Sequence, residues 1–164
     1  MTAAKFRGFS RPVPPLTLTV AELVALAPGT DLGHTAWRRL TQQEVDAFAE
    51  LTGDRNPVHV DPAFAATTRF GGTIAHGYFG LALLAPVFEQ LLDVRGASLS
   101  LNYGLDRVRF PAPLPVGAEY RGAGRVEAVE PIEAGAQLKL ALALEVRGGE
   151  RPAVAAECLS RFYA

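Results

Sequence analysis

The most constraining feature of this sequence is an apolar segment that runs from Ile74 to about Leu92. Placed on a helix, its large apolar side chains would point to every side. A helix that is hydrophobic all round is a buried one. Its longest apolar stretch, about 15 residues, is shorter than the roughly 20 that a membrane span requires. We therefore expect a core helix, bent or weakened by Pro86, which cannot donate to the carbonyl of Ala82.

Beyond Gly96 the periodicity changes to that of β-strands. The clearest strand is 138–146, in which Leu and Val alternate with smaller or charged residues. Further strands are expected over residues 98–110, about 117–129 and 152–163, separated by Gly- and Pro-containing turns. A curved antiparallel sheet can wrap a helix that is apolar on all sides. The sequence therefore predicts an α+β protein with the hot-dog fold.

Two Thr-x-x-Glu capping boxes, at residues 19–22 and 41–44, predict two helices ahead of this core. The second helix should cover about 42–52 and end at a glycine. Residues 1–18 are rich in proline near their end and are expected to form a poorly ordered leader. Residues 19–164 are then expected to form one hot-dog domain.

The composition restricts the partners and the compartment. The 16 basic and 17 acidic residues give a formal net charge of −1, so neither nucleic acid nor an anionic membrane is an expected partner. The lone Cys158 excludes an intramolecular disulfide framework and suits a reducing compartment. Prolines stand where a signal peptide needs its apolar run. We expect a cytoplasmic protein.

The residues able to carry chemistry lie between Asp54 and Gly77. Asn56-Pro57 predicts a turn that brings Asp54 and His59 toward one another. A carboxylate and an imidazole on one loop can hold a water molecule and move its protons in both directions. Gly77 stands where the apolar helix begins, and free backbone N–H groups at such a position can stabilise a developing oxyanion.

This segment resembles the hydratase 2 motif of the MaoC-like dehydratase family, which includes the (R)-specific enoyl-CoA hydratases. The resemblance rests on Asp-x-Asn-Pro-x-His-x-Asp-Pro followed by Phe-Gly-Gly-x-Ile-x-His-Gly, and extends over roughly residues 20–164. It implies that Asp54 and His59 are the catalytic pair, that Asn56 orients them, and that the Gly77 N–H receives the thioester carbonyl.

The reaction implied is reversible syn addition of water to a trans-2-enoyl thioester, giving the (R)-3-hydroxyacyl product. The resemblance calls for no cofactor. It implies an acyl-CoA or acyl carrier protein substrate, a homodimer, and an acyl tunnel to which Tyr78 and Phe79 contribute. One departure is that many relatives carry a serine a turn or two after His-Gly, whereas here the Tyr78 phenol is the one hydroxyl in 78–85.

That missing serine leaves a non-catalytic acyl-thioester binding subunit as an alternative. A hot-dog thioesterase is a second alternative, since a fold alone does not decide function. The Asp-x-Asn-Pro-x-His spacing favours hydration, because the resemblance ties this loop to that reaction.

The remaining polar candidates have simpler interpretations. His59, Asp61 and His76 match no usual zinc spacing and no second thiol is available, so no metal site is predicted. Asp61 is expected to cap a short helix, and the His76 ring to bond to backbone. His34 is expected at the surface. Gly122-Ala123-Gly124 is expected to mark a bend or bulge in the sheet.

Overall fold

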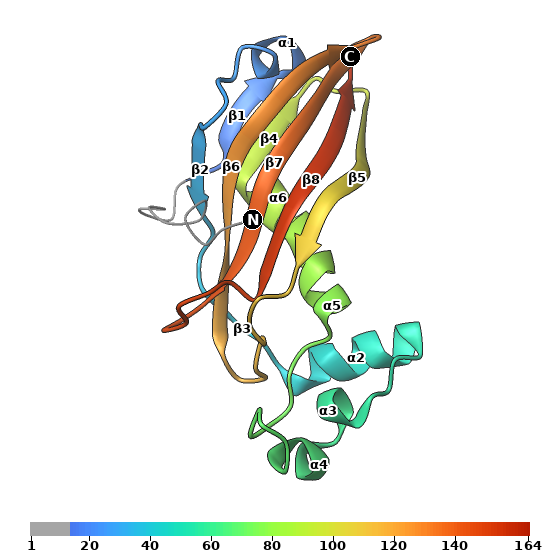
Figure 1. Ribbon diagram of the computed structural model, residues 1–164. Coiled ribbons are helices and arrows are strands. Elements are labelled where there is room, and N and C mark those ends of the chain that lie inside the picture. The colour runs from blue at the N-terminus through green and yellow to red at the C-terminus, as the bar shows by residue number, and fades with distance from the viewer. Residues whose placement is uncertain (1–13) are drawn as a thin grey trace.

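A six-stranded antiparallel sheet, with a pair of helices packed on one face, forms the body of the protein (Figure 1). The computed structural model describes residues 14–164. The elements in chain order are β1 (Leu16–Thr19), α1 (Val20–Leu23), β2 (Asp31–His34), β3 (Arg38–Arg39), α2 (Gln42–Thr52), α3 (Pro57–Val60), α4 (Pro62–Ala66), α5 (Gly77–Ala82), α6 (Leu84–Leu91), β4 (Leu92–Arg95), β5 (Leu99–Arg109), β6 (Glu119–Ile132), β7 (Gly135–Val146) and β8 (Val154–Tyr163).

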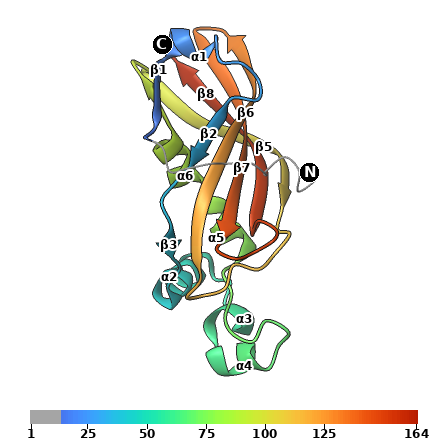
Figure 2. The same ribbon diagram turned by 90° about the vertical axis from the view of Figure 1, so that its left-hand side faces the viewer.

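The sheet order is β2-β6-β7-β8-β5, with β3 also pairing with β6. The long hairpins β6–β7 and β7–β8 form its centre, and β5 is an edge strand. Helices α2, α3 and α4 gather at one end of the sheet, at the bottom of both views (Figure 2). The predicted α+β hot-dog architecture and its four long C-terminal strands are confirmed. No helix in the described part of the chain is both long enough and apolar enough to span a membrane.

Two glycines allow α6 to lie directly on β6. A Cβ at Gly122 would overlap the side chain of Val87, and a Cβ at Gly124 would come within 2.8 Å of Leu91 Cδ1. Val87 and Leu91 are buried residues of α6. The expected irregularity is found at Gly124, where the pairing of β6 with β2 shifts by one residue, whereas β6 pairs with β7 without a shift over 122–124. The two glycines also serve the close approach of a helix to the sheet, which the sequence did not predict.

The apolar segment forms two helices, α5 and α6, separated at Leu83. The interruption precedes Pro86, in agreement with the expected weakening near this residue. The segment is also less buried than its sequence predicts. Tyr78 is 72% exposed, and Ala82 and Ala85 are exposed. The described chain therefore covers one side of this helical segment and leaves the other open.

The N-terminal expectation needs one correction. Leu16–Thr19 lies mostly inside the expected leader, yet it forms β1 and pairs in parallel with β4, with Leu16 opposite Leu92. Alternation of leucine and threonine over these four residues fits a half-buried strand. Residues 1–13 of the expected leader lie outside the described part of the chain.

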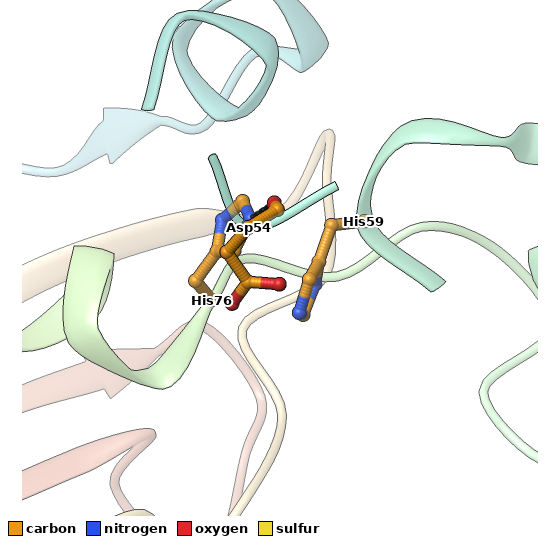
Figure 3. Close-up of side chains that lie close together, drawn as sticks. All are labelled: Asp54, His59 and His76. Atoms are coloured by element: carbon orange, nitrogen blue, oxygen red, sulfur yellow. Dashed lines mark hydrogen bonds between the residues drawn. The ribbon is translucent and has the colours of Figure 1, made fainter. Parts of the chain in front are cut away.

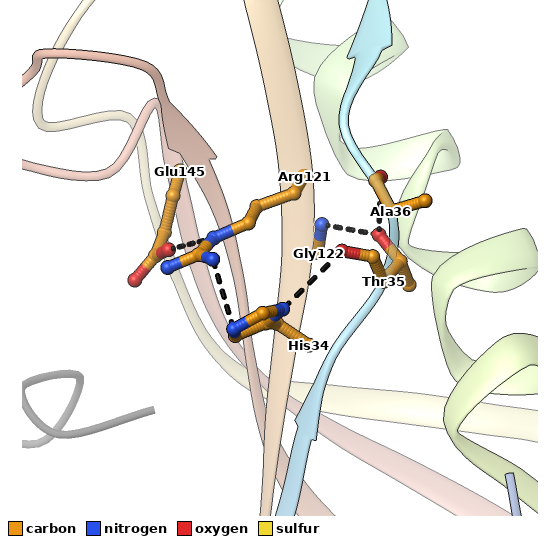
Figure 4. A network of polar contacts seen from close by, with 6 residues as sticks. All are labelled: His34, Thr35, Ala36, Arg121, Gly122 and Glu145. Carbon is orange, nitrogen blue, oxygen red and sulfur yellow. Dashed lines mark hydrogen bonds and ion pairs between the residues drawn. The ribbon is translucent and has the colours of Figure 1, made fainter. Parts of the chain in front are cut away.

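His34 is 3% exposed and belongs to a polar network on the sheet, contrary to the expected surface position (Figure 4). Arg121 Nη1 donates to His34 Nε2 at 2.9 Å, and Arg121 Nε donates to Glu145 at 2.7 Å. The same guanidinium lies 4.7 Å from the centre of the Trp37 ring. These contacts cover the imidazole, which a sequence pattern cannot show because β2 is distant in sequence from β6 and β7.

Candidate active site

Asp54, His59 and His76 meet between the end of α2, helix α3 and the start of α5 (Figure 3). One polar side-chain atom of each lies within 4.8 Å of those of the other two. Asp54 is exposed, His59 is half-buried and His76 is buried. The structure thus brings together the predicted pair, Asp54 and His59, and adds a second histidine beside it.

The end of α2 places Asp54. Gly53 is the C-cap residue with φ 78°, a left-handed conformation that turns the chain out of the helix. The Asp54 N–H then donates to Thr52 Oγ1 at 3.3 Å, and the Asp54 carboxylate accepts from the Asn56 N–H at 3.4 Å. These local bonds hold the carboxylate next to its own loop and leave it accessible to solvent.

Asn56 and Pro57 place His59 by starting α3. The Asn56 side-chain oxygen accepts from the Val58 N–H at 3.3 Å, while Pro57 occupies the first turn, where no N–H is needed. Asn56 therefore acts on the pair through the backbone: it caps the helix that carries His59, and its N–H contacts the Asp54 carboxylate. This geometry is compatible with the orienting role expected of Asn56.

The His59 ring is fixed by the backbone of the segment before α5. Its Nδ1 lies 2.8 Å from the Ile74 carbonyl oxygen, which can only accept, so Nδ1 carries a proton. In the neutral ring, Nε2 is then an acceptor. Burial lowers the pKa of His59 and nearby His76 acts in the same direction, whereas the Ile74 carbonyl and Asp54 oppose the shift. The net lowering favours a neutral imidazole that can accept a proton.

Gln42 and Thr73 form hydrogen bonds that hold the backbone at His59, and the sequence did not predict this contribution. The Gln42 amide nitrogen donates to the His59 carbonyl at 2.8 Å, and its amide oxygen accepts from Thr73 Oγ1 at 2.6 Å. These bonds join the first turn of α2 to α3 and to the strand-like segment before Ile74. No local sequence pattern connects residues 31 positions apart, so only the fold reveals this link.

His76 lies against the same pair. Its Nε2 is 2.8 Å from the backbone carbonyl oxygen of Asp54, which confirms the expected bond from this ring to backbone. The centres of the His59 and His76 rings are 3.9 Å apart, with 35° between their planes. Because the rings largely face each other, their in-plane nitrogen lone pairs do not converge. The geometry is therefore poorly suited to a metal ion shared by both histidines.

Gly77 begins α5 beside a cavity of about 300 Å³ that His59, His76 and Phe110 also line. The His76 side chain makes no capping bond to the first turn of α5, and the Gly77 N–H donates to no other residue in the described chain. A Cβ at position 77 would lie 2.9 Å from two ring carbons of Phe110, so this position favours glycine. The cavity wall thus combines an imidazole with an available backbone donor.

The two expected tunnel residues are placed differently from each other. Tyr78 is exposed near the cavity, with its ring centre 6.2 Å from that of Phe110. Phe79 stacks on Phe48, with ring centres 5.0 Å apart, and Phe48 in turn packs against His76. Tyr78 therefore lies at the surface beside Phe110, which lines the cavity, whereas Phe79 packs against Phe48 on the inner side of His76.

The sequence matches the MaoC-like domain model over residues 23–144. It is 44% identical over 147 residues to 3-hydroxyacyl-thioester dehydratase Z of Mycobacterium tuberculosis (strain ATCC 25618 / H37Rv), covering 89% of this chain and 97% of that relative. Among solved structures it resembles an (R)-hydratase from A. caviae involved in PHA biosynthesis, with a TM-score of 0.69 and 32% identity over 83% of this chain and 96% of that one. R-hydratase PhaJ1 from Pseudomonas aeruginosa gives a TM-score of 0.70 and 27% identity over 87% and 83%.

Proposed function

This chain belongs to the MaoC-like domain family, and from that membership we propose that it catalyses reversible hydration of trans-2-enoyl thioesters to (R)-3-hydroxyacyl thioesters. It is a hydro-lyase, in keeping with the dehydratase and hydratase activities for which its relatives are named. The observation that carries the proposal is that His59 and Gly77 line one cavity, and that the Asp54 carboxylate lies within 4.8 Å of the His59 imidazole. The acyl group is carried by coenzyme A or by an acyl carrier protein.

The separation of the pair suits a single bridging water. Two hydrogen bonds of about 2.8 Å that meet at a tetrahedral oxygen span about 4.5 Å. The Asp54 and His59 atoms lie within 4.8 Å of each other. A water held between them can therefore bond to both side chains at once, and this is the nucleophile of the proposed reaction.

In the hydration direction, the water oxygen forms a bond to C3 of the enoyl group as the C2–C3 π electrons move toward the thioester carbonyl. Asp54 and His59 share removal of one water proton and delivery of a proton to C2 on the same face. The Gly77 N–H stabilises the negative charge that develops on the thioester oxygen, a contribution on the order of 3 kcal/mol for one such donor. Dehydration is the reverse, so neither direction needs a redox partner.

We propose that the active form is a cytoplasmic homodimer in which β5 meets a second copy. β5 is an edge strand of the described sheet, and every one of its residues except Val108 is exposed. An exposed apolar edge strand invites pairing with another chain. The side chains that support this interface are Leu99, Leu101, Tyr103 and Leu105, all between 43% and 52% exposed.

The oligomer is tested by light scattering after gel filtration. The wild type is expected at twice the chain mass of 17.5 kDa. Leu101→Glu should reduce it to the monomer, because a charge would be buried without a partner. Leu51→Glu is the matched control, since Leu51 is 84% exposed on α2. A monomeric wild type contradicts the proposed dimer.

The reaction is tested with crotonyl-CoA by following loss of the enoyl absorbance. The wild type is expected to form (R)-3-hydroxybutyryl-CoA, and Asp54→Asn and His59→Ala should each lower kcat by roughly 10²–10⁴-fold. Asp93→Asn, on β4, is the carboxylate control and should keep wild-type activity. Release of free thiol would indicate a thioesterase. Binding without turnover, with longer enoyl-CoA and carrier-protein substrates as well, would indicate an acyl-thioester binding subunit.

A further inference from the structure

His76 occupies a position that the proposed chemistry does not yet use. It is the N-cap residue of α5 and is 2% exposed. Its side chain turns away from the helix and contacts both members of the proposed catalytic pair: the Asp54 backbone through Nε2 and the His59 ring through its face. Figure 3 shows the three side chains grouped together.

We propose that His76 is a positioning residue that is held as the Nε2–H tautomer. Its hydrogen bond fixes the Asp54 backbone, and its ring packs against the His59 imidazole and limits the movement of that ring. The inference rests on the proposed function in that it takes Asp54 and His59 as the acid/base pair. It adds a residue that transfers no proton in this mechanism and acts through its two neighbours.

The hydrogen bond to Asp54 carries the first part of the argument. A carbonyl oxygen can only accept, so the His76 nitrogen 2.8 Å from it must bear the proton. The other bonds of Asp54, at 3.3 Å and 3.4 Å, are longer and connect it only to Thr52 and Asn56 of its own loop. His76 is therefore the contact that ties this loop to α5, across 22 residues of sequence.

The packing of the ring carries the second part. The ring centre of Phe48, on α2, lies 5.0 Å from that of His76. Phe48 also stacks on Phe79 of α5. His59 of α3 lies 3.9 Å away. The ring is thus held between α2, α3 and α5, so it cannot change rotamer without moving one of them. A fixed His76 restricts the His59 ring in turn.

The electrostatic surroundings are simple. The titratable groups beside His76 are His59 from α3 and Asp54 from the preceding loop, and Arg69 lines the same cavity. Helices α2 and α5 present the aromatic rings of Phe48 and Phe79. The Nδ1 atom of His76 is buried and has no hydrogen-bond partner in the described chain. The unpartnered Nδ1 fits the Nε2–H tautomer, because the one proton of the neutral ring is used in the bond to the Asp54 carbonyl.

The tautomer is tested directly by long-range ¹H–¹⁵N NMR of the imidazoles, because the protein has only three histidines. At a pH where all three are neutral, we expect Nδ1–H for His34 and His59, whose Nδ1 atoms lie near the Thr35 and Ile74 carbonyls, and Nε2–H for His76 alone. The Nε2–H pattern should disappear in His76→Gln. An Nδ1–H tautomer at His76, or averaging between the two forms, overturns the proposal whether or not the protein turns over enoyl thioesters.

The positioning role is tested by pairing His76→Leu with His76→Gln. Leucine removes the donor to Asp54, and we expect kcat to fall about 10- to 100-fold with KM changed less than threefold. The glutamine amide can reach the same carbonyl, so His76→Gln should recover most of this loss. His34→Gln, at a buried histidine away from the site, controls for general effects on folding.

The outcomes separate this inference from the proposed function. If the wild type is active, Asp54→Asn and His59→Ala are inactive, and His76→Leu equals the wild type, then the function stands and the role of His76 is refuted. If the wild type shows no turnover, the proposed function fails, and the NMR tautomers still decide how His76 is held. Should His76→Leu not fold, equal losses of kcat in His76→Gln and in His76→Asn, which cannot reach the carbonyl, would refute the positioning role.

Discussion

The substitution Gly77→Ala should lower the activity while it leaves the free energy of unfolding nearly unchanged. The new Cβ would lie 2.9 Å from two carbons of the Phe110 ring, whereas ordinary carbon contacts are about 3.5–4.0 Å. The ring must therefore withdraw by about 0.6 Å or more. Phe110 is 45% exposed, so it can rotate toward solvent at little cost. Gly→Ala also stabilises a helical position by about 0.5–1 kcal/mol, and the net change in unfolding free energy should stay within about 1 kcal/mol.

Catalysis should respond differently, because the methyl group stands beside the N–H that we propose receives the thioester oxygen. Complete loss of such a donor costs about 10²–10³-fold in kcat. A displaced donor should cost less, so we expect kcat/KM for crotonyl-CoA to fall about 10- to 100-fold. Gly80→Ala, one turn later on α5, is the matched variant. Its Cβ would lie 2.8 Å from Val154 Cγ2, and Val154 is only 1% exposed and cannot withdraw.

Gly80→Ala should therefore destabilise the protein by about 1–3 kcal/mol through overpacking, which lowers Tm by roughly 3–10 °C in a chain of this size. Thermal unfolding followed by circular dichroism gives Tm, and the crotonyl-CoA assay gives kcat/KM for the same samples. Gly77→Ala should lose activity and keep its Tm. If Gly77→Ala melts as early as Gly80→Ala, the argument that the Phe110 ring can withdraw is refuted. If it retains full activity, the assignment of Gly77 as the donor to the thioester oxygen is refuted.

Four further outcomes follow from the geometry. In the hydration direction kcat/KM should rise with pH with a midpoint below 6.5, because burial lowers the pKa of His59 and only its neutral form accepts a proton; a midpoint above 6.5 contradicts this. Asn56→Ala should cost about 1 kcal/mol in urea unfolding through loss of the α3 cap, and Asn56→Asp should restore it. Gly122→Ala should cost at least about 1–3 kcal/mol, because a Cβ overlaps Val87; unchanged stability would refute the close helix–sheet approach. Cys158 should resist thiol reagents in the native state at pH 8, since burial raises its pKa to about 12, and rapid labelling would contradict this.

The sequence predicted those parts of the fold whose signals are local. The capping box at Thr41 and the left-handed Gly53 mark the two ends of α2 at their observed positions. Alternation of leucines predicted β7 in the same way. The strands it missed are short, and β2 and β3 exist because each pairs with β6, with partners 80 to 94 residues apart in sequence. A strand of two to four residues has too few positions to show a period.

The candidate site likewise has parts that local sequence signals predict and parts that depend on the tertiary fold. The motif identified Asp54 and His59 because Asn56-Pro57 keeps them on one loop, and α3 forms there as the turn residues require. The contacts of Gln42 and the exact partner of His76 depend on how α2, α3 and α5 meet. A histidine that opens an apolar helix has no local signature of its hydrogen-bond partner. The sequence therefore predicts a bond from His76 to backbone, but not that this backbone belongs to the loop that carries Asp54.

The one broad expectation that the single chain does not meet concerns the apolar segment over α5 and α6. Its sequence is apolar on every side, yet Ala82 and Ala85 are exposed, and a cavity of about 250 Å³ separates this open side from β5 and β8. The apolar character of a segment reflects its burial in the functional assembly, whereas a single chain buries only the surface that it covers itself. On the proposed dimer both facts have the same cause, because the second copy that pairs along β5 also covers the open side of the helices. The exposed edge strand and the incompletely covered helices are then two parts of one interface.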